Sequence, residues 1–210
     1  METLDDYLTQ LSSGSATPGG GSAAMVVAAA GAALVAMVAR ISAANPKYAG
    51  QHQAAETIAA KADVLRGRFV EARKRDEDAF QRVVEAQRLP KDSDAQKDAR
   101  ATTLELALHG AAAVPLELAQ SALEAMQLVD EALQIGHKNL VSDLGCAAEF
   151  SFAAVMGCGY SVRINHKYMK NQDTVREQSA QLAQIEEAAS GILKEARQRV
   201  AAALSDCRQR

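Results

Sequence analysis

Residues 23–39 read AAMVVAAAGAALVAMVA and contain no charged side chain. Small residues recur at three- and four-residue spacing in this stretch, at Ala24, Ala28, Gly31 and Ala32, so that one helix face is small enough for neighbouring helices to approach closely. The stretch has about the minimum length of a membrane span, but alanine dominates it and is close to neutral for membrane insertion. No tryptophan and no basic cluster flank it as interfacial anchors. We therefore expect a core helix of a bundle rather than a membrane helix.

The rest of the 210-residue chain has the composition of a helical protein. Hydrophobic residues make up 48% and aromatic residues only 4%, while alanine, leucine, glutamate, glutamine, lysine and arginine, which favour helices, are abundant. No segment alternates as a half-buried strand does. The sequence predicts an all-α fold, in which residues 1–210 form a single domain of about six to seven long, alanine-rich helices.

Glycine and proline residues predict where these helices end. Six helices are expected, over residues 3–11, 22–44, 50–88, 93–135, 142–165 and 173–207. Ser22 and Ser142 are the expected N-caps of the second and fifth helices. Pro115 is expected to kink the fourth helix or to divide it in two.

Charge and motif content exclude several classes of protein. A net charge of −3, with 23 basic against 26 acidic residues, gives no electrostatic footprint for nucleic acid. The histidines and cysteines show no zinc spacing, and neither a Walker lysine nor a GxSxG motif is present. The N-terminus lacks the features of a secretory signal, and Cys146, Cys158 and Cys207 include no CxxC pair. We expect a cytoplasmic protein with reduced thiols and without a metal.

The most unusual local feature is the segment Pro18-Gly19-Gly20-Gly21-Ser22, which leads directly into a predicted helix. Glycine lets the backbone press against a ligand, and a helix start offers unpaired N–H groups to a carboxylate or phosphate. A flexible connector would have the same composition, so the segment alone leaves both interpretations open.

Three further groups of residues have the chemistry of a site. Asn139, Ser142 and Asp143 lie together at a predicted helix start, where they could bind a polar heterocycle and supply a carboxylate; a simple helix cap is the alternative. Asp76 interrupts an apolar helical stripe, where burial would raise its pKa, although it also belongs to a charged run that could be solvated. Arg163 could bind an anion, or it could be an ordinary exposed arginine.

Taken in chain order, these pieces resemble the formiminotetrahydrofolate cyclodeaminase / methenyltetrahydrofolate cyclohydrolase family. The string TPGGGSAA at residues 17–24, followed by GAALVAMV at residues 31–38, resembles the family's N-terminal signature. Further matches cover almost the whole chain: Lys47-Tyr48, Asp76 with Ala79-Phe80, Leu89-Pro90-Lys91, Val114-Pro115-Leu116, Asn139 with Ser142-Asp143 and Gly145, and Val162 with Ile164-Asn165.

The resemblance implies a homodimer that packs through its helices, with a tetrahydrofolate site near the subunit interface and no cofactor beyond the folate substrate. It implies catalytic roles for Asp143, Asp76 and Lys47. The residues that would bind the folate are Pro18, Gly19, Gly20, Gly21, Ser22, Tyr48, His137, Asn139, Ser142, Arg163 and Asn165. We expect the glycine segment and the stretch 139–143 to converge on one cleft.

The implied reaction interconverts 5,10-methenyltetrahydrofolate and 10-formyltetrahydrofolate. Closure of 5-formiminotetrahydrofolate with release of ammonia is the alternative, and a catalytically inactive folate-binding or interaction subunit is a further one. The chain also departs from the family pattern: it reads Asn45-Pro46 before Lys47-Tyr48, where many members have a glycine–lysine pair, and Gly136-His137 where glycine–asparagine is usual. A histidine there could transfer protons near neutral pH or mark a different substrate preference.

Overall fold

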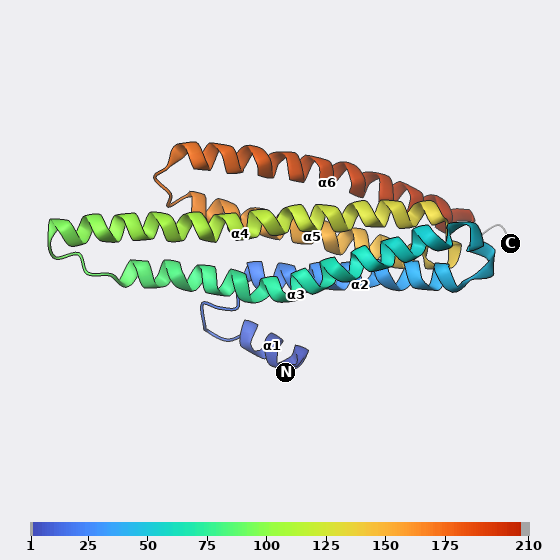
Figure 1. Ribbon diagram of the computed structural model, residues 1–210, viewed down its shortest axis with the longest axis horizontal. Helices are drawn as coiled ribbons and strands as arrows, with labels where there is room; N and C mark the ends of the chain where they lie inside the picture. Colours follow the sequence, from blue (N-terminus) through green and yellow to red (C-terminus); the bar gives the residue numbers. More distant parts are fainter. Residues whose placement is uncertain (1, 207–210) are drawn as a thin grey trace.

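The structure, a computed structural model, describes residues 2–206 and consists of long helices joined by short connections (Figure 1). The α-helices are α1 (Leu4–Leu11), α2 (Gly20–Ala44), α3 (His52–Arg88), α4 (Asp94–Ile135), α5 (Val141–His166) and α6 (Gln172–Asp206). Two short 3-10 helices, η1 (Pro46–Gln51) and η2 (Lys138–Leu140), lie in the connections before α3 and α5. The described residues contain no strand, so the all-α prediction is confirmed.

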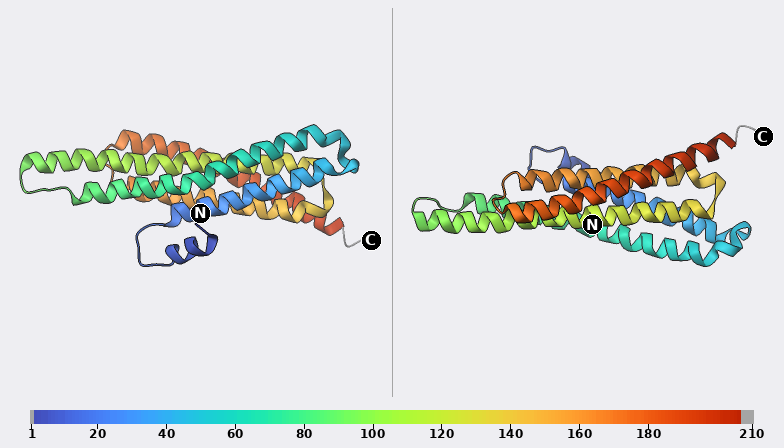
Figure 2. Two further views of the ribbon diagram at one scale, coloured as in Figure 1. Left: turned by 60° about the horizontal axis from the view of Figure 1, so that its bottom comes forward. Right: turned by 90° about the horizontal axis from the view of Figure 1, so that it is seen from above.

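The long helices run lengthwise and alternate in direction (Figures 1 and 2). α2 packs mainly against α3 and α5, α4 packs against α3 and α5, and α6 covers α4 and α5. The short helix α1 lies outside the bundle, beside the beginning of α2 (Figure 1). Because α2 and α5 each run from one end of the bundle towards the other, the residues at their two ends lie far apart.

Small residues allow the central helices to approach closely. Ala28, Ala32 and Ala36 of α2 are almost completely buried. At Gly31, a Cβ atom would lie 2.9 Å from the Ser151 hydroxyl oxygen of α5, which is closer than normal van der Waals contact. The predicted core helix is therefore present, and its small residues set the distance between α2 and α5.

Three details of the helix boundaries differ from the sequence prediction. α2 begins at Gly20, with Gly19 rather than Ser22 as N-cap, and the Ser22 hydroxyl donates to Glu77 of α3 instead. α5 begins at Val141, directly after the 3-10 turn η2, so that Leu140 rather than Ser142 is the N-cap. α4 continues through Pro115 without being divided, so division, one of the two expected outcomes, does not occur; the Ala111 carbonyl, to which Pro115 cannot donate, accepts a hydrogen bond from Asn165 of α5.

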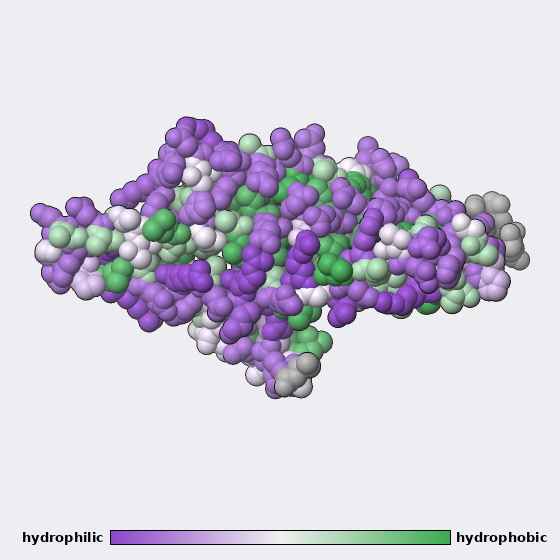
Figure 3. Space-filling model, viewed as in Figure 1, coloured by the Kyte–Doolittle hydropathy of each residue, from purple (hydrophilic) through white to green (hydrophobic). Residues whose placement is uncertain are grey.

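The two sides of the bundle differ in polarity. The face formed by α3, α4 and α6 is mostly hydrophilic (Figure 3). α2 and α5 also leave large apolar side chains exposed, namely Met37, Ile41, Phe150, Tyr160 and Ile164, as α3 and α4 do at Val64, Val70 and Leu106. By length and composition alone, α2 and residues 138–166 could cross a membrane. Of the most apolar 18-residue segment in each, 56% and 39%, respectively, is buried inside the bundle.

Candidate active site

A cavity of about 280 Å³ lies at the start of α2 and brings several predicted residues together. The glycine segment contributes Gly19, Gly20 and Gly21, α3 contributes Asp76, and α5 contributes Asn165. Apolar side chains such as Phe80, Leu108 and Ile164 complete the walls. A larger and more open groove of about 480 Å³ between α3, α4 and α6 contains none of the predicted site residues. The cavity at the start of α2 is therefore the stronger candidate.

Asp76 lies directly against the first turn of α2. A Cβ atom at Gly21 would be 2.5 to 2.7 Å from the atoms of the Asp76 carboxyl group, so only glycine leaves room for this carboxyl. The backbone N–H of Ser22, in the first turn of α2, lies close enough to the Asp76 carboxyl group to lower its pKa. A carboxylate in this position faces the unpaired N–H groups at the start of α2 and the positive end of the helix dipole.

The environment of Asp76 brings its pKa close to neutrality. The pKa of Asp76 is raised from 3.8 to about 6, mainly by burial and then by the neighbouring charge of Glu77, while the Ser22 N–H lowers it. A carboxyl group with such a pKa can both accept and donate a proton near neutral pH. Asp76 is thus a half-buried carboxyl group in the cavity wall, and its catalytic role stays a prediction.

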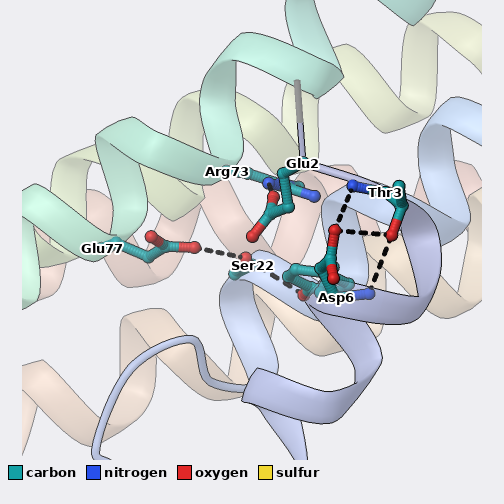
Figure 4. A network of polar contacts seen from close by, with 7 residues as sticks. Glu2, Thr3, Asp6, Ser22, Arg73 and Glu77 are labelled. Carbon is teal, nitrogen blue, oxygen red and sulfur yellow. Dashed lines mark hydrogen bonds and ion pairs between the residues drawn. The ribbon is translucent and has the colours of Figure 1, made fainter.

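A second network fixes α1 to the same corner (Figure 4). The Tyr7 hydroxyl lies 3.1 Å from the Ser22 hydroxyl, and the Ser22 hydroxyl donates to a Glu77 carboxylate oxygen at 2.9 Å. Arg73 lies over the Tyr7 ring, 4.3 Å from its centroid, and pairs with Glu2. Ser22 therefore points away from the cavity, and Tyr7 and Glu77 support its wall without lining it.

Sequence reasoning did not identify Tyr7 and Glu77. Glu77 sits in a charged run that resembles a solvated face, and Tyr7 lies on a short helix of no special composition. Only the folded arrangement, in which Tyr7 is 1% exposed, shows their role. The one available signal was a lone tyrosine on a helix just upstream of the glycine segment.

Asn165 is held rigidly in the cavity wall, whereas Arg163 is engaged elsewhere. The Asn165 side-chain amide donates to the backbone carbonyls of Ala111, at 3.0 Å, and Ser161, at 2.8 Å. The Arg163 guanidinium forms two hydrogen bonds with the Glu186 carboxylate of α6, at 2.8 and 2.6 Å, and does not line the cavity. In this structure Arg163 binds α6, which is contrary to its expected place in the site.

The remaining predicted residues gather at the opposite end of the bundle. The Tyr48 and His137 rings lie 4.9 Å apart, and the Lys47 ammonium is 5.8 Å from the Tyr48 ring centroid. Both ring nitrogens of His137 are buried and have no hydrogen-bond partner. A small cavity of about 180 Å³ lies beside His137, with Lys138 and Arg199 in its wall.

Asn139, Ser142 and Asp143 lie next to this second group, at the start of α5. Asp143 and Asn165 stand near opposite ends of α5, which places them roughly 33 Å apart at 1.5 Å per residue. A single chain therefore does not bring the glycine segment and the stretch 139–143 together in the expected cleft. The physical reason is that α2 and α5 separate the two groups by nearly their whole length.

The two cysteines that the structure describes, Cys146 and Cys158, belong to neither group. Cys158 is fully buried near Asp76, and burial, followed by the Asp76 charge, raises the pKa of its thiol to about 12. Cys146 is a free, exposed thiol, and Cys207 lies outside the described residues. In the part of the chain that the structure describes, no group of three histidine, cysteine or acidic residues could hold a metal ion.

Comparison with known proteins agrees with the motifs. The family model described as formiminotransferase-cyclodeaminase matches residues 3–184. The methenyltetrahydrofolate cyclohydrolase of Methylorubrum extorquens is 32% identical over 195 residues, which cover 93% of this chain and 90% of that protein. The formimidoyltransferase-cyclodeaminase of Sus scrofa is 30% identical over 201 residues, which cover 96% of this chain but only 36% of that longer protein.

A solved structure shows the same fold. The formiminotetrahydrofolate cyclodeaminase from Thermotoga maritima matches with a TM-score of 0.87 over 96% of this chain and 97% of that chain, at 24% identity. The glycine-rich segment, Asp76 and the later Asn-x-x-Ser-Asp stretch had predicted this relationship from the sequence. The chain thus belongs to the formiminotransferase-cyclodeaminase family.

Proposed function

We propose that the protein is a methenyltetrahydrofolate cyclohydrolase, which interconverts 5,10-methenyltetrahydrofolate and 10-formyltetrahydrofolate. The observation that carries this proposal is the Asp76 carboxyl group, whose pKa is raised to about 6 and which lies in a cavity lined by the glycine segment. The relative in Methylorubrum extorquens, which matches this chain over nearly its full length, has the same activity in its name.

The geometry supports a simple sequence of proton transfers. Water adds to the amidinium-like carbon between N5 and N10, and ionised Asp76 takes one of its protons. The resulting tetrahedral carbon then loses its bond to N5, and the carboxylic acid of Asp76 returns the proton to that nitrogen while the formyl group forms on N10. The second proton of the water leaves to solvent. A group with a pKa near 6 suits both transfers.

The alternative is the cyclodeaminase reaction, in which the N10 nitrogen of 5-formiminotetrahydrofolate attacks the formimino carbon and ammonia leaves. The names of the mammalian relatives and of the Thermotoga maritima protein favour it. This reaction passes through the same kind of tetrahedral carbon, so Asp76 would again transfer protons. The third alternative is that this protein has lost catalysis and serves as a folate-binding or interaction subunit.

We further propose that the protein works as a homodimer in which the exposed apolar surface of α2 and α5 is the interface. Gly31 and Ser151 meet near the middle of these helices. A two-fold axis through this midpoint would place the Lys47–His137–Asp143 end of one subunit beside the Asp76 cavity of its partner. The two groups that one chain keeps apart would then form a composite folate site, and the apolar helices would be covered in a cytoplasmic protein.

Absorbance of the methenyl chromophore tests the reaction. We expect the purified protein to accelerate its loss, and the Asp76→Asn variant to lack this activity while remaining folded. Turnover of the formimino substrate, measured in parallel, separates the two reactions. Folate binding without turnover of either substrate would support the inactive subunit, and absence of folate binding would refute every folate assignment.

A further inference from the structure

Pro115 leaves one backbone carbonyl of α4 without its usual intrahelical partner. In an α-helix the N–H of residue 115 would donate to the carbonyl of residue 111, but proline has no N–H. The Ala111 carbonyl instead accepts a hydrogen bond from the Asn165 side chain of α5, at 3.0 Å. Pro115 is itself buried, so this exchange of partners takes place inside the bundle, next to the cavity.

The Ala111 carbonyl also determines which way the Asn165 amide faces. The two N–H bonds of its amide nitrogen are directed at the carbonyl oxygens of Ala111 and Ser161, at 3.0 and 2.8 Å. A flipped amide would place the side-chain oxygen against two other acceptors and would lose both hydrogen bonds. The Asn165 oxygen is therefore left free as an acceptor, and Asn165 lines the cavity that contains Asp76.

We propose that Pro115 is a positioning residue: by withholding an N–H from the Ala111 carbonyl, it fixes the Asn165 amide so that the cavity presents its oxygen to an N–H donor of the ligand. This inference rests on the proposed function for the identity of that ligand. The amino group and ring N–H groups of a reduced pterin are donors of the required kind, whereas a ligand edge with only acceptors would be rejected by the Asn165 oxygen.

The first test measures stability and does not depend on activity. Asn165→Leu removes the amide and leaves the Ala111 carbonyl without a hydrogen-bond donor. An unpaired buried carbonyl lowers the free energy of unfolding. In a Pro115→Ala background the new N–H of residue 115 satisfies that carbonyl. We therefore expect Asn165→Leu to lower the urea midpoint of unfolding clearly in the wild-type background, and by less in the Pro115→Ala background.

Two further variants control this comparison. Pro115→Val supplies the same N–H with a larger side chain, so it is expected to reduce the effect of Asn165→Leu as Pro115→Ala does, even if packing changes the stability of either single variant. Pro90→Ala, in the exposed connection before α4, is expected to leave that effect unchanged. Equal effects of Asn165→Leu in the wild-type, Pro115→Ala and Pro115→Val backgrounds would overturn the proposal.

The second test measures recognition of the ligand. Loss of one oriented hydrogen bond is worth roughly a factor of ten in binding. We expect Pro115→Ala to raise KM for the methenyl substrate about tenfold, with a smaller change in kcat, and Pro90→Ala to change neither. An unchanged KM in Pro115→Ala would refute the positioning role. If the wild-type protein does not turn over folate at all, the proposed function fails, and the unfolding experiment still decides the coupling between Pro115 and Asn165.

Discussion

Replacement of Gly21 by alanine tests whether contact between α2 and Asp76 sets the geometry of the site. The added Cβ atom would lie 2.5 to 2.7 Å from the Asp76 carboxyl atoms, whereas ordinary contacts begin about 1 Å farther away. The carboxyl group must therefore move by roughly that distance or the helices must separate. Overpacking of this kind costs about 1–3 kcal/mol, and a misplacement of about 1 Å can lower turnover about a hundredfold.

Gly67 in α3 provides the control, because a Cβ atom there meets nothing within 4 Å and Gly67 does not line the cavity. Alanine is the better helix former at both positions by up to about 1 kcal/mol, so helix propensity cannot account for a difference between the two variants. The assay is kcat/KM from the loss of methenyl absorbance, together with thermal unfolding. A Gly21→Ala protein that keeps kcat/KM within about twofold of the Gly67→Ala protein would refute the contact argument.

Two more variants examine Asp76 and the apolar surface. The pKa of Asp76 is raised from 3.8 to about 6 in the folded protein, so its contribution to stability is fully present below pH 3.8 and is lost as the pH rises through 6. Asp76→Asn is therefore expected to be more stable than the wild-type protein at pH 8, by up to about 3 kcal/mol, and this difference in stability should disappear towards pH 4. Equal unfolding midpoints of the two proteins at pH 8 would contradict the burial of the Asp76 charge. Ala33→Glu places a charge on the exposed side of α2 and is expected to convert the dimer to a monomer in sedimentation experiments. Ala60→Glu, on the exposed side of α3, is expected to leave the dimer intact. A wild-type protein that is monomeric at micromolar concentration would refute the proposed interface.

Several helix boundaries could be predicted from the sequence because they have a local cause. Thr3 and Ser93 form capping boxes at the starts of α1 and α4, and Gly136 ends α4 in the left-handed conformation with a φ of 77°. The starts of α2 and α5 were misplaced by one or two residues because their causes are not local. The Ser22 hydroxyl donates to Glu77 of another helix, and a 3-10 turn leads directly into α5.

The candidate site could be predicted only in part, for a related reason. A sequence identifies residues with suitable chemistry, and Asp76, the glycine segment and Asn165 do meet in one cavity. It does not state which end of a helix bundle each residue occupies, so it does not reveal that Asp143 of the same chain lies at the opposite end. The partners of Arg163 and Asn165 were equally hidden, because Glu186 is far along the chain and the Ala111 carbonyl is made available only by Pro115.

The distance between Asp76 and Asp143 leads to an experiment that distinguishes a composite site from a site within one subunit. If one site takes Asp76 from one subunit and Asp143 from the other, then Asp76→Asn and Asp143→Asn homodimers each lack activity, but a mixed dimer contains one intact site. Random mixing of equal amounts should then restore about a quarter of the wild-type activity, since half of the dimers are mixed and each has one of two sites intact.

The arithmetic differs if each subunit holds its own complete site. Every chain in the mixture then carries one of the two substitutions, and no intact site can form. The two chains are unfolded and refolded together, so that subunits exchange, and each variant refolded alone is the control. Activity only in the mixture would establish that the two ends of the bundle meet across the interface. Absence of activity in the mixture, with mixed dimers demonstrated by differently tagged chains, would show that the Asp143 end serves another purpose.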